Sequence, residues 1–246
     1  MQLQYLCSFE LDSDIESSLG QLPPDLNALY DDLYGLLSRK PGRAQAAVFK
    51  NALSWLLCAQ RTLKTEEFLC AVSIGSKSGS SVKVASKDLV LKICNNFVIF
   101  DPELDTFRFA HLSVREYLEQ RPEYCSTTIN ALAAEVCLWT VLSASSNINI
   151  EKWLLELGWR ANGSPATVEQ LCAYADIYWP GHCKLAKEQR SFGKLKEMLQ
   201  HVLITVRGAS SAISLWHNRL RRHLTDYQYW NEKRALEDTL LNIDSK

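Results

Sequence analysis

The stretch FDPELDTFRFAHLSVREYLE, residues 100–119, predicts a β-hairpin that leads directly into an α-helix. Its segment TFRFAH places Phe107 and Phe109 on one face and Arg108 on the other, which is the alternation of a half-buried strand. The preceding DPELD combines a proline with acidic residues, as turns do. We therefore expect two short strands joined by an acidic turn.

A single histidine lies where the hairpin meets the helix. Ser113 is followed by Glu116 three residues later, the spacing of a capping box, which predicts that the helix begins at Ser113. His111 then lies just before the helix N-terminus, where backbone N–H groups and the helix dipole favour an anion. An imidazole there could donate a hydrogen bond to a phosphate oxygen. The simpler interpretation of a lone histidine is a half-buried side chain bonded to a neighbouring backbone group.

Three helical segments precede the hairpin. The segment 44–59 is apolar nearly all round, which predicts a central buried helix. Thr65, followed by two glutamates, begins the next helix, and Ser86 has the side chain of an N-cap for the third. Three helices followed by a hairpin is the order of a winged-helix domain.

From Pro122 onward the pattern is helical only. Helices are predicted over 127–142, 168–179 and 192–206, and Pro180 with Gly181 is expected to end the second of them. The expected fold class is therefore mainly α, with a winged-helix domain, a small β-hairpin wing and a following all-α helical domain. The expected divisions of the chain are linker helices over 1–43, the winged-helix domain over 44–121, the helical domain over 122–226 and a polar tail over 227–246.

The composition is that of an ordinary globular protein. Hydrophobic residues make up 47% of the chain and charged residues 22%, enough to bury a core. The net charge of −1 gives no reason to expect a nucleic-acid or membrane-surface partner. The eight cysteines include no C-x-x-C pair, so we expect neither a zinc site nor a redox motif. Their apolar settings and the absence of a signal-peptide pattern indicate a cytoplasmic location.

Four phrases carry a family resemblance. AHLSVREYLE (110–119) resembles the end of the winged-helix domain of NACHT-type NLR proteins, in particular the fungal NACHT–ankyrin proteins, and of the winged-helix domain named after GPI inositol-deacylase. LPPDLNALYDDLYGLL (22–37) is similar to the helix that leads out of the NACHT ATPase module, and ALSWLLCAQRTLKTEEFLCAVSI (52–74) to the first half of the winged helix. CAYADIYWPGHC (172–183) resembles a phrase in the helical segment before the ankyrin array. Their order and spacing agree, so the resemblance covers about residues 1–220.

The resemblance implies a regulatory segment of an NLR-like STAND signalling protein. Its partners would be a NACHT ATPase domain and ankyrin repeats, in cis or in a related protein. His111 occupies the position of the family histidine that contacts the β-phosphate of ADP and holds the closed, inactive state. The winged helix would then swing as a rigid body, sense the nucleotide state and relay it between the ATPase and the sensor repeats.

No enzymatic activity is expected of this chain. Ser54 lacks the G-x-S-x-G elbow, and His182 and Cys183, being adjacent on a helix, would point in different directions. There is also no G-x-x-x-x-G-K-[ST] phosphate loop. We therefore expect no catalytic residue, no metal site and no cofactor in the chain alone; ADP or ATP would bind only together with a NACHT domain.

Two other functions fit parts of the pattern. The chain could be a stand-alone protein-interaction module or a truncated decoy that binds a full-length relative. A weaker alternative is a DNA-binding regulator that uses the helix at 86–96. That helix offers Lys87 and Lys92 against Asp88, and the wing is acidic, whereas a DNA reader needs a cationic face. Protein contact is therefore expected, with no nucleic-acid or membrane partner.

Overall fold

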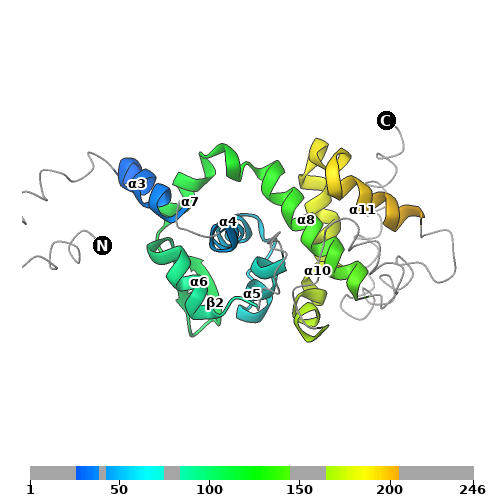
Figure 1. Ribbon diagram of the computed structural model, residues 1–246, viewed down its shortest axis with the longest axis horizontal. Helices are drawn as coiled ribbons and strands as arrows, with labels where there is room; N and C mark the ends of the chain where they lie inside the picture. Colours follow the sequence, from blue (N-terminus) through cyan, green and yellow to red (C-terminus); the bar gives the residue numbers. More distant parts are fainter. Residues whose placement is uncertain (1–25, 39–42, 75–83, 145–164, 205–246) are drawn as a thin grey trace, which may run out of the picture.

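The apolar helix predicted over 44–59 lies at the centre of the fold. It is α4 (Arg43–Cys58), and its Ala52, Leu53 and Trp55 are fully buried. The elements around it are α3 (Leu26–Ser38), α5 (Thr65–Ile74), α6 (Lys87–Cys94), η1 (Asn95–Phe97), β1 (Val98–Asp101), β2 (Thr106–Phe109) and α7 (Leu112–Glu119). Figure 1 looks nearly along α4, with α5, α6 and α7 around it. The computed structural model describes residues 26–38, 43–74, 84–144 and 165–204.

The predicted hairpin is the pair β1 and β2, which run antiparallel with Phe100 opposite Phe107. Phe107 is buried and stacks on Phe68 of α5, their ring centroids 4.7 Å apart. Arg108 points to solvent, so the predicted alternation is confirmed. Within the described ranges these are the only two strands, and the mainly α fold with a small wing is as predicted.

Hydrogen bonds hold the wing turn at both ends. The carboxylate of Asp101 accepts the backbone N–H groups of Glu103 and Leu104 at 3.1 and 3.2 Å. Thr65 of α5 donates its hydroxyl to the Asp105 carboxylate at 2.7 Å and its N–H to the Asp105 carbonyl at 3.0 Å. Asp105 has a φ of 53°, in the left-handed region that aspartate enters more readily than most residues. The wing is thereby attached to α5.

The capping box predicted at Ser113 is wrong. The helix α7 begins one residue earlier, with His111 as N-cap, and no side chain caps it. The Ser113 hydroxyl instead hydrogen-bonds the hydroxyl of Tyr30 on α3, at 2.9 Å. The Ser113 hydroxyl, which the local pattern predicted to bond a backbone N–H of α7, is therefore bonded to a residue far away in the sequence. The prediction for Ser86 is confirmed, because its side chain accepts a backbone N–H in the first turn of α6.

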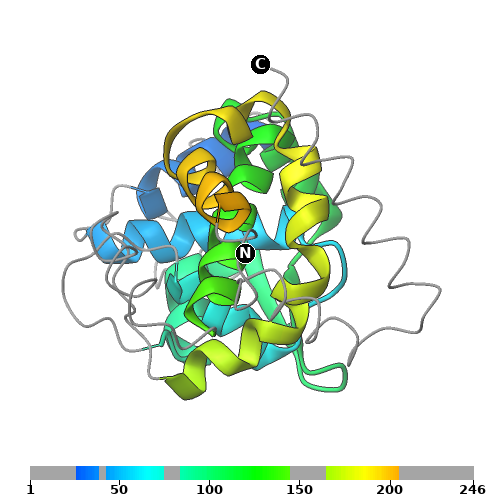
Figure 2. The same cartoon turned by 90° about the vertical axis from the view of Figure 1, so that its right-hand side faces the viewer.

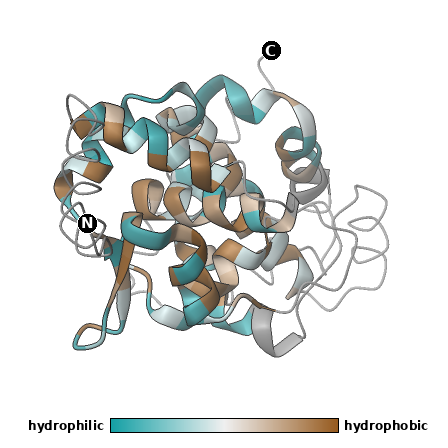
Figure 3. Cartoon of the chain, turned by 60° about the vertical axis from the view of Figure 1, so that its left-hand side comes forward, coloured by the Kyte–Doolittle hydropathy of each residue, from teal (hydrophilic) through white to brown (hydrophobic). Residues whose placement is uncertain are grey.

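The second half of the described chain is helical, as predicted. Its elements are η2 (Pro122–Tyr124), α8 (Ser126–Ser143), α10 (Pro165–Leu185), η3 (Lys187–Ser191) and α11 (Gly193–Ile204). Figure 2 brings these helices to the front, where α10 runs alongside α8. Because α8 also packs on α4 and α10 on α5, apolar residues of both halves form one core. The hydrophobic faces of the helices turn toward this core in Figure 3.

The helix α10 continues through the proline that was predicted to end it. Pro180 lies inside α10, which runs on to Leu185. A proline within a helix costs about 3 kcal/mol, because it removes a hydrogen bond and crowds the preceding turn. His182 and Cys183, two and three residues further on, are nonetheless fully buried. The tertiary contacts of these two residues outweigh the local preference of the helix to end at Pro180.

We expect Gly181→Ala to change the free energy of unfolding by less than about 1 kcal/mol. Alanine is favoured over glycine inside a helix by about 1 kcal/mol. The added Cβ would lie 2.5 Å from the side-chain amide of Gln60, but Gln60 is exposed and its amide can turn away. Urea unfolding followed by tryptophan fluorescence measures the change. A loss above about 2 kcal/mol would mean that Gln60 cannot move.

Some predicted segments lie outside the described residues. These are residues 1–25 and 39–42 of the expected linker, residues 145–164 and 205–226 of the expected helical domain, including the end of the helix predicted over 192–206, and the tail over 227–246. The boundary expected between residues 121 and 122 stays a prediction.

Candidate functional site

His111 lies at the N-terminal end of α7, as predicted from the sequence. Its side chain is exposed and makes no capping hydrogen bond. Its carbonyl oxygen accepts the N–H of Val114 at 3.2 Å and closes the first turn. The imidazole therefore lies beside the first N–H groups of a helix and is accessible from outside. Its contact with a phosphate stays a prediction.

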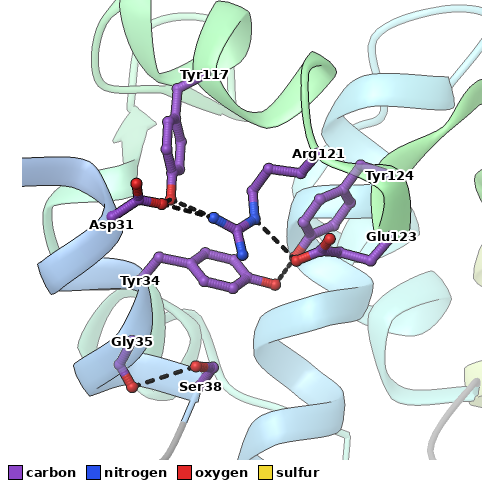
Figure 4. A network of polar contacts seen from close by, with 8 residues as sticks. All are labelled: Asp31, Tyr34, Gly35, Ser38, Tyr117, Arg121, Glu123 and Tyr124. Atoms are coloured by element: carbon purple, nitrogen blue, oxygen red, sulfur yellow. Dashed lines mark hydrogen bonds and ion pairs between the residues drawn. The ribbon is translucent and has the colours of Figure 1, made fainter. Parts of the chain in front are cut away.

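A second polar centre, which the sequence analysis missed, joins α3 to the end of the winged helix. We call it the Arg121 cluster. It consists of Asp31 and Tyr34 of α3, Tyr117 of α7, and Arg121, Glu123 and Tyr124 from the segment that follows α7. Figure 4 shows the Arg121 guanidinium in the middle, between Asp31 and Glu123.

The guanidinium of Arg121 bonds in two directions. One of its terminal nitrogens, Nη1, donates to Asp31 at 2.8 Å and to the Tyr117 hydroxyl at 2.6 Å. Its Nε donates to Glu123 at 2.8 Å. The Tyr117 hydroxyl in turn donates to Asp31 at 2.6 Å, so each polar group in this part of the cluster has a partner.

The plane of the guanidinium also lies against an aromatic face. Its central carbon is 4.1 Å from the centre of the Tyr34 ring, within the range of a cation–π contact. The Tyr34 hydroxyl hydrogen-bonds that of Tyr124 at 3.2 Å. The inner edge of α3 is thus fastened to the winged helix by aromatic and polar groups together, with Arg121 in contact with both.

Charge in the Arg121 cluster is stabilised by pairing. Burial is the largest single influence on the pKa of Arg121 and would lower it, but the hydrogen bond to Glu123 and the electrostatic interactions with Glu123, Tyr117 and Tyr34 together raise that pKa. Burial is likewise the largest influence on the pKa of Glu123 and would raise it, but the hydrogen bonds with Arg121, Tyr34 and the backbone, together with the charge of Arg121, hold that pKa below the usual value. Burial, followed by the hydrogen bond to Asp31, raises the pKa of Tyr117. All three groups keep their ordinary charge states near neutral pH.

Part of the Arg121 cluster had a sequence signal. Asp31 and Tyr34 are three residues apart on one helix, and Tyr117 and Arg121 are four residues apart at the end of another. Residues at this spacing share a helix face. Nothing local indicates that the two faces meet, because Asp31 and Arg121 are separated by 90 positions.

A third polar group is buried where α8, α10 and the end of α4 meet; we call it the His182 network. His182 Nδ1 lies 2.7 Å from the side-chain oxygen of Asn130, and its Nε2 lies 2.8 Å from the Tyr174 hydroxyl. That hydroxyl accepts the backbone N–H of Gln60 at 2.9 Å. The ring of Trp55 packs edge-on against the imidazole, with centroids 6.0 Å apart.

These partners assign the protons of the His182 network. The amide nitrogen of Asn130 donates to the Ser126 carbonyl at 2.8 Å, so its oxygen faces the imidazole and can only accept. Nδ1 of His182 therefore carries the hydrogen, and Nε2 accepts from Tyr174. Burial lowers the pKa of His182 to about 4, so the imidazole is neutral at physiological pH.

The cysteines divide into two groups. Burial raises the pKa to about 12 for four of them, which are Cys58, Cys70, Cys94 and Cys183. Cys125 is exposed just before α8, and hydrogen bonds with Thr127 and Thr128 lower its pKa. Both ring nitrogens of His182 are hydrogen-bonded to other residues, Tyr174 and Asn130. The imidazole is therefore not paired with the thiol of the adjacent Cys183.

In the part of the chain that the structure describes, no three His, Cys, Asp or Glu side chains gather in a way that could hold a metal ion. Among the same residues, no helix has the length and apolar character needed to cross a membrane.

The order of helices and hairpin, with α7 closing the wing, agrees with a known domain. Residues 38–131 match the family model of the GPI inositol-deacylase, winged helix domain. The matched segment begins at the last residue of α3 and ends within α8, so it contains α4 to α7, the wing and η2. The boundaries predicted from the sequence, 44–121, fall inside it. No curated protein and no solved structure matches the chain.

Most of the polar centres described above belong to this winged-helix domain or to its edges. His111, Arg121 and Glu123 lie within the match, whereas Asp31 on α3 precedes it and His182 follows it. The Arg121 cluster thus connects the winged-helix domain to the helix before it, and the His182 network connects it to the helices after it. The domain is attached on both sides through partly or fully buried polar bonds.

Proposed function

We propose that this chain is a non-enzymatic regulatory segment of an NLR-like STAND signalling protein. In this proposal the winged-helix domain senses the nucleotide state of a NACHT ATPase domain and relays it to sensor repeats. The observation that carries the proposal is the exposed His111 imidazole at the uncapped N-terminus of α7. Such a helix end attracts an anion, and the ring adds a directed donor.

The attachments on either side of the winged-helix domain support a relay. A signal reaches a distant part of a protein when an element has two positions and each ligand favours one of them. α3 contributes Tyr30 and Leu37 to the core and is also joined to the domain by polar contacts at its edge, such as that of the exposed Asp31. α8 and α10 share the same core and pack along α4 and α5. The domain and the C-terminal helices would move together, and the junction with α3 would be the place that opens.

The decisive experiment measures binding of the full chain to a separately expressed NACHT domain of an NLR-like relative, with ADP or ATP present. We expect tighter binding with ADP, and we expect His111→Ala to weaken the ADP-dependent binding by about tenfold to a hundredfold. This is the effect of losing one hydrogen bond to a charged phosphate. Stability should not change, because the imidazole is exposed and caps nothing.

Glu116→Ala is the matched control, because Glu116 is also exposed on α7. It should leave the preference for ADP intact. Binding that ignores both the nucleotide and His111 would contradict the sensor role and would favour a plain protein-interaction module. Absence of binding to any NACHT domain would contradict both the sensor role and an interaction with NACHT domains. It would leave a module that acts on its own, without a NACHT partner.

A further inference from the structure

The described surface has a pocket of about 360 Å³ between the end of α4, α5, the wing and α7. Its lining includes four aromatic residues, Trp55, Phe68, Phe107 and Phe109, of which only Phe109 is partly exposed. Leu104, at the tip of the wing, lies on its edge and is 60% exposed. A hollow lined by both apolar and polar groups and bordered by an exposed leucine is a surface on which another chain segment can bind.

Three arginines also line this pocket: Arg61 from the connection between α4 and α5, Arg108 from β2 and Arg115 from α7. Arg61 is held by two hydrogen bonds to Glu67. The other two are less engaged. Arg108 is 57% exposed and 3.4 Å from Asp101, and Arg115 is 49% exposed and pairs with Glu119 on the same exposed face of α7. Exposed ion pairs of this kind contribute little and exchange readily for another carboxylate.

A pocket with aromatic walls and available arginines fits a segment that is both apolar and acidic. Residues 1–25 of this chain have that composition. They contain five carboxylates and no lysine or arginine, and the run YLCSFEL at 5–11 supplies tyrosine, leucine and phenylalanine. Other stretches of the chain outside the described residues, such as 205–246, contain several arginines and lysines.

The segment 1–25 is also tethered close to the pocket. It joins α3 at Leu26, and Tyr30, one turn further on, is hydrogen-bonded to Ser113 of α7. Arg115, on the border of the pocket, is two residues beyond Ser113 and so lies on the other side of α7 from the contact with α3. An extended chain of 25 residues spans up to about 80 Å, far more than the width of α7. A short tether also gives a high effective concentration, so individually weak contacts suffice.

We propose that residues 1–25 dock in cis on the arginine-lined pocket, with their carboxylates on Arg108 and Arg115 and their apolar side chains against Leu104 and Phe109. This segment then covers the face formed by the wing and α7. The inference is independent of the proposed function, because it involves neither a nucleotide nor a NACHT domain.

A photo-crosslink on the full chain tests this docking. A benzophenone amino acid replaces Leu104 at the edge of the pocket, and the irradiated protein is digested with trypsin and analysed by mass spectrometry. The first tryptic site is Arg39, so the expected product joins the wing to a peptide from residues 1–39. The same probe at Leu89, 40% exposed on α6 and outside the pocket, is the positional control and should not give this product.

Charge reversal then tests what holds the segment. Arg108→Glu combined with Arg115→Glu should reduce the yield of the crosslink at least tenfold, whereas Lys50→Glu combined with Lys196→Glu, on other exposed faces, should leave it unchanged. Circular dichroism establishes that each variant is folded. A crosslink to a second copy, identified by mixing isotopically labelled and unlabelled protein, would overturn docking in cis. So would a product without residues 1–39, or a yield that charge reversal does not alter.

Discussion

Lowering the pH from 7 to 4 should remove about 3 kcal/mol of stability through one residue, His182. The unfolded chain protonates this imidazole below a pKa of about 6.5, but burial keeps it neutral in the folded protein down to a pKa of about 4. Between these values the unfolded state holds more protons, so the stability falls as the pH falls. A pKa difference of this size corresponds to about 3 kcal/mol.

The partners of His182 explain why the folded state resists its protonation. A second N–H, on Nε2, would face the Tyr174 hydroxyl, which now donates to that nitrogen. The charge would also lie beside the Trp55 ring in the core, 6.0 Å from centroid to centroid. Placing an unpaired charge there is costly. The loss should therefore begin below about pH 6.5 and be complete near pH 4.

The measurement is urea unfolding at several pH values for wild type and for His182→Gln. Glutamine keeps hydrogen-bonding groups but does not titrate in this range. All other titrating residues are common to both proteins, so the difference between their pH profiles isolates His182. At pH 7 the variant should have a lower free energy of unfolding than wild type, and this free energy should fall less between pH 7 and pH 4. Parallel profiles would contradict the assignment of a neutral buried imidazole.

The second large effect is expected for Arg121→Leu, which should lower the free energy of unfolding by about 2 to 3 kcal/mol. It removes hydrogen bonds to Asp31, Tyr117 and Glu123, as well as the contact with the Tyr34 ring. Hydrogen bonds involving a charge contribute more than neutral ones, and leaving the partly buried Glu123 without its cationic partner adds to the loss.

Two measurements establish where the effect of Arg121→Leu arises. Urea unfolding gives the change in stability, and hydrogen exchange of the α3 amides reports whether α3 detaches before the rest of the protein unfolds. Lys50→Leu is the control, because Lys50 is exposed on α4, lies outside both the cluster and the pocket, and should change stability by less than about 1 kcal/mol when replaced. Equal effects of the two substitutions, or unchanged exchange in α3, would mean that the cluster does not fasten this helix.

Local patterns predicted the elements of the fold well where one face of a segment is buried. The alternation of Phe107 and Arg108 predicted the strand, and Ser86 predicted the start of α6. Such signals arise from the period of the backbone itself and need no knowledge of the partner. They failed at Ser113 and Pro180, where a tertiary partner competes with the local preference.

The position of His111 could also be predicted, because it follows from the junction of hairpin and helix. Its exposure could not, since a lone histidine is as compatible with burial as with a surface site. The histidine that the structure buries is His182, whose partner Asn130 is 52 positions away. The sequence indicated only that His182 and Cys183 would point in different directions on one helix.

The sequence by itself determined the helices, the hairpin and the apolar faces that form the core, because these depend on periodicity within about ten residues of chain. Only the tertiary structure decided which polar side chains meet: Arg121 with Asp31, His182 with Asn130, and the arginines around the aromatic pocket. Hydrogen bonds and ion pairs depend on distances of about 3 Å between particular atoms. Such distances are set only when helices remote in the sequence pack against one another.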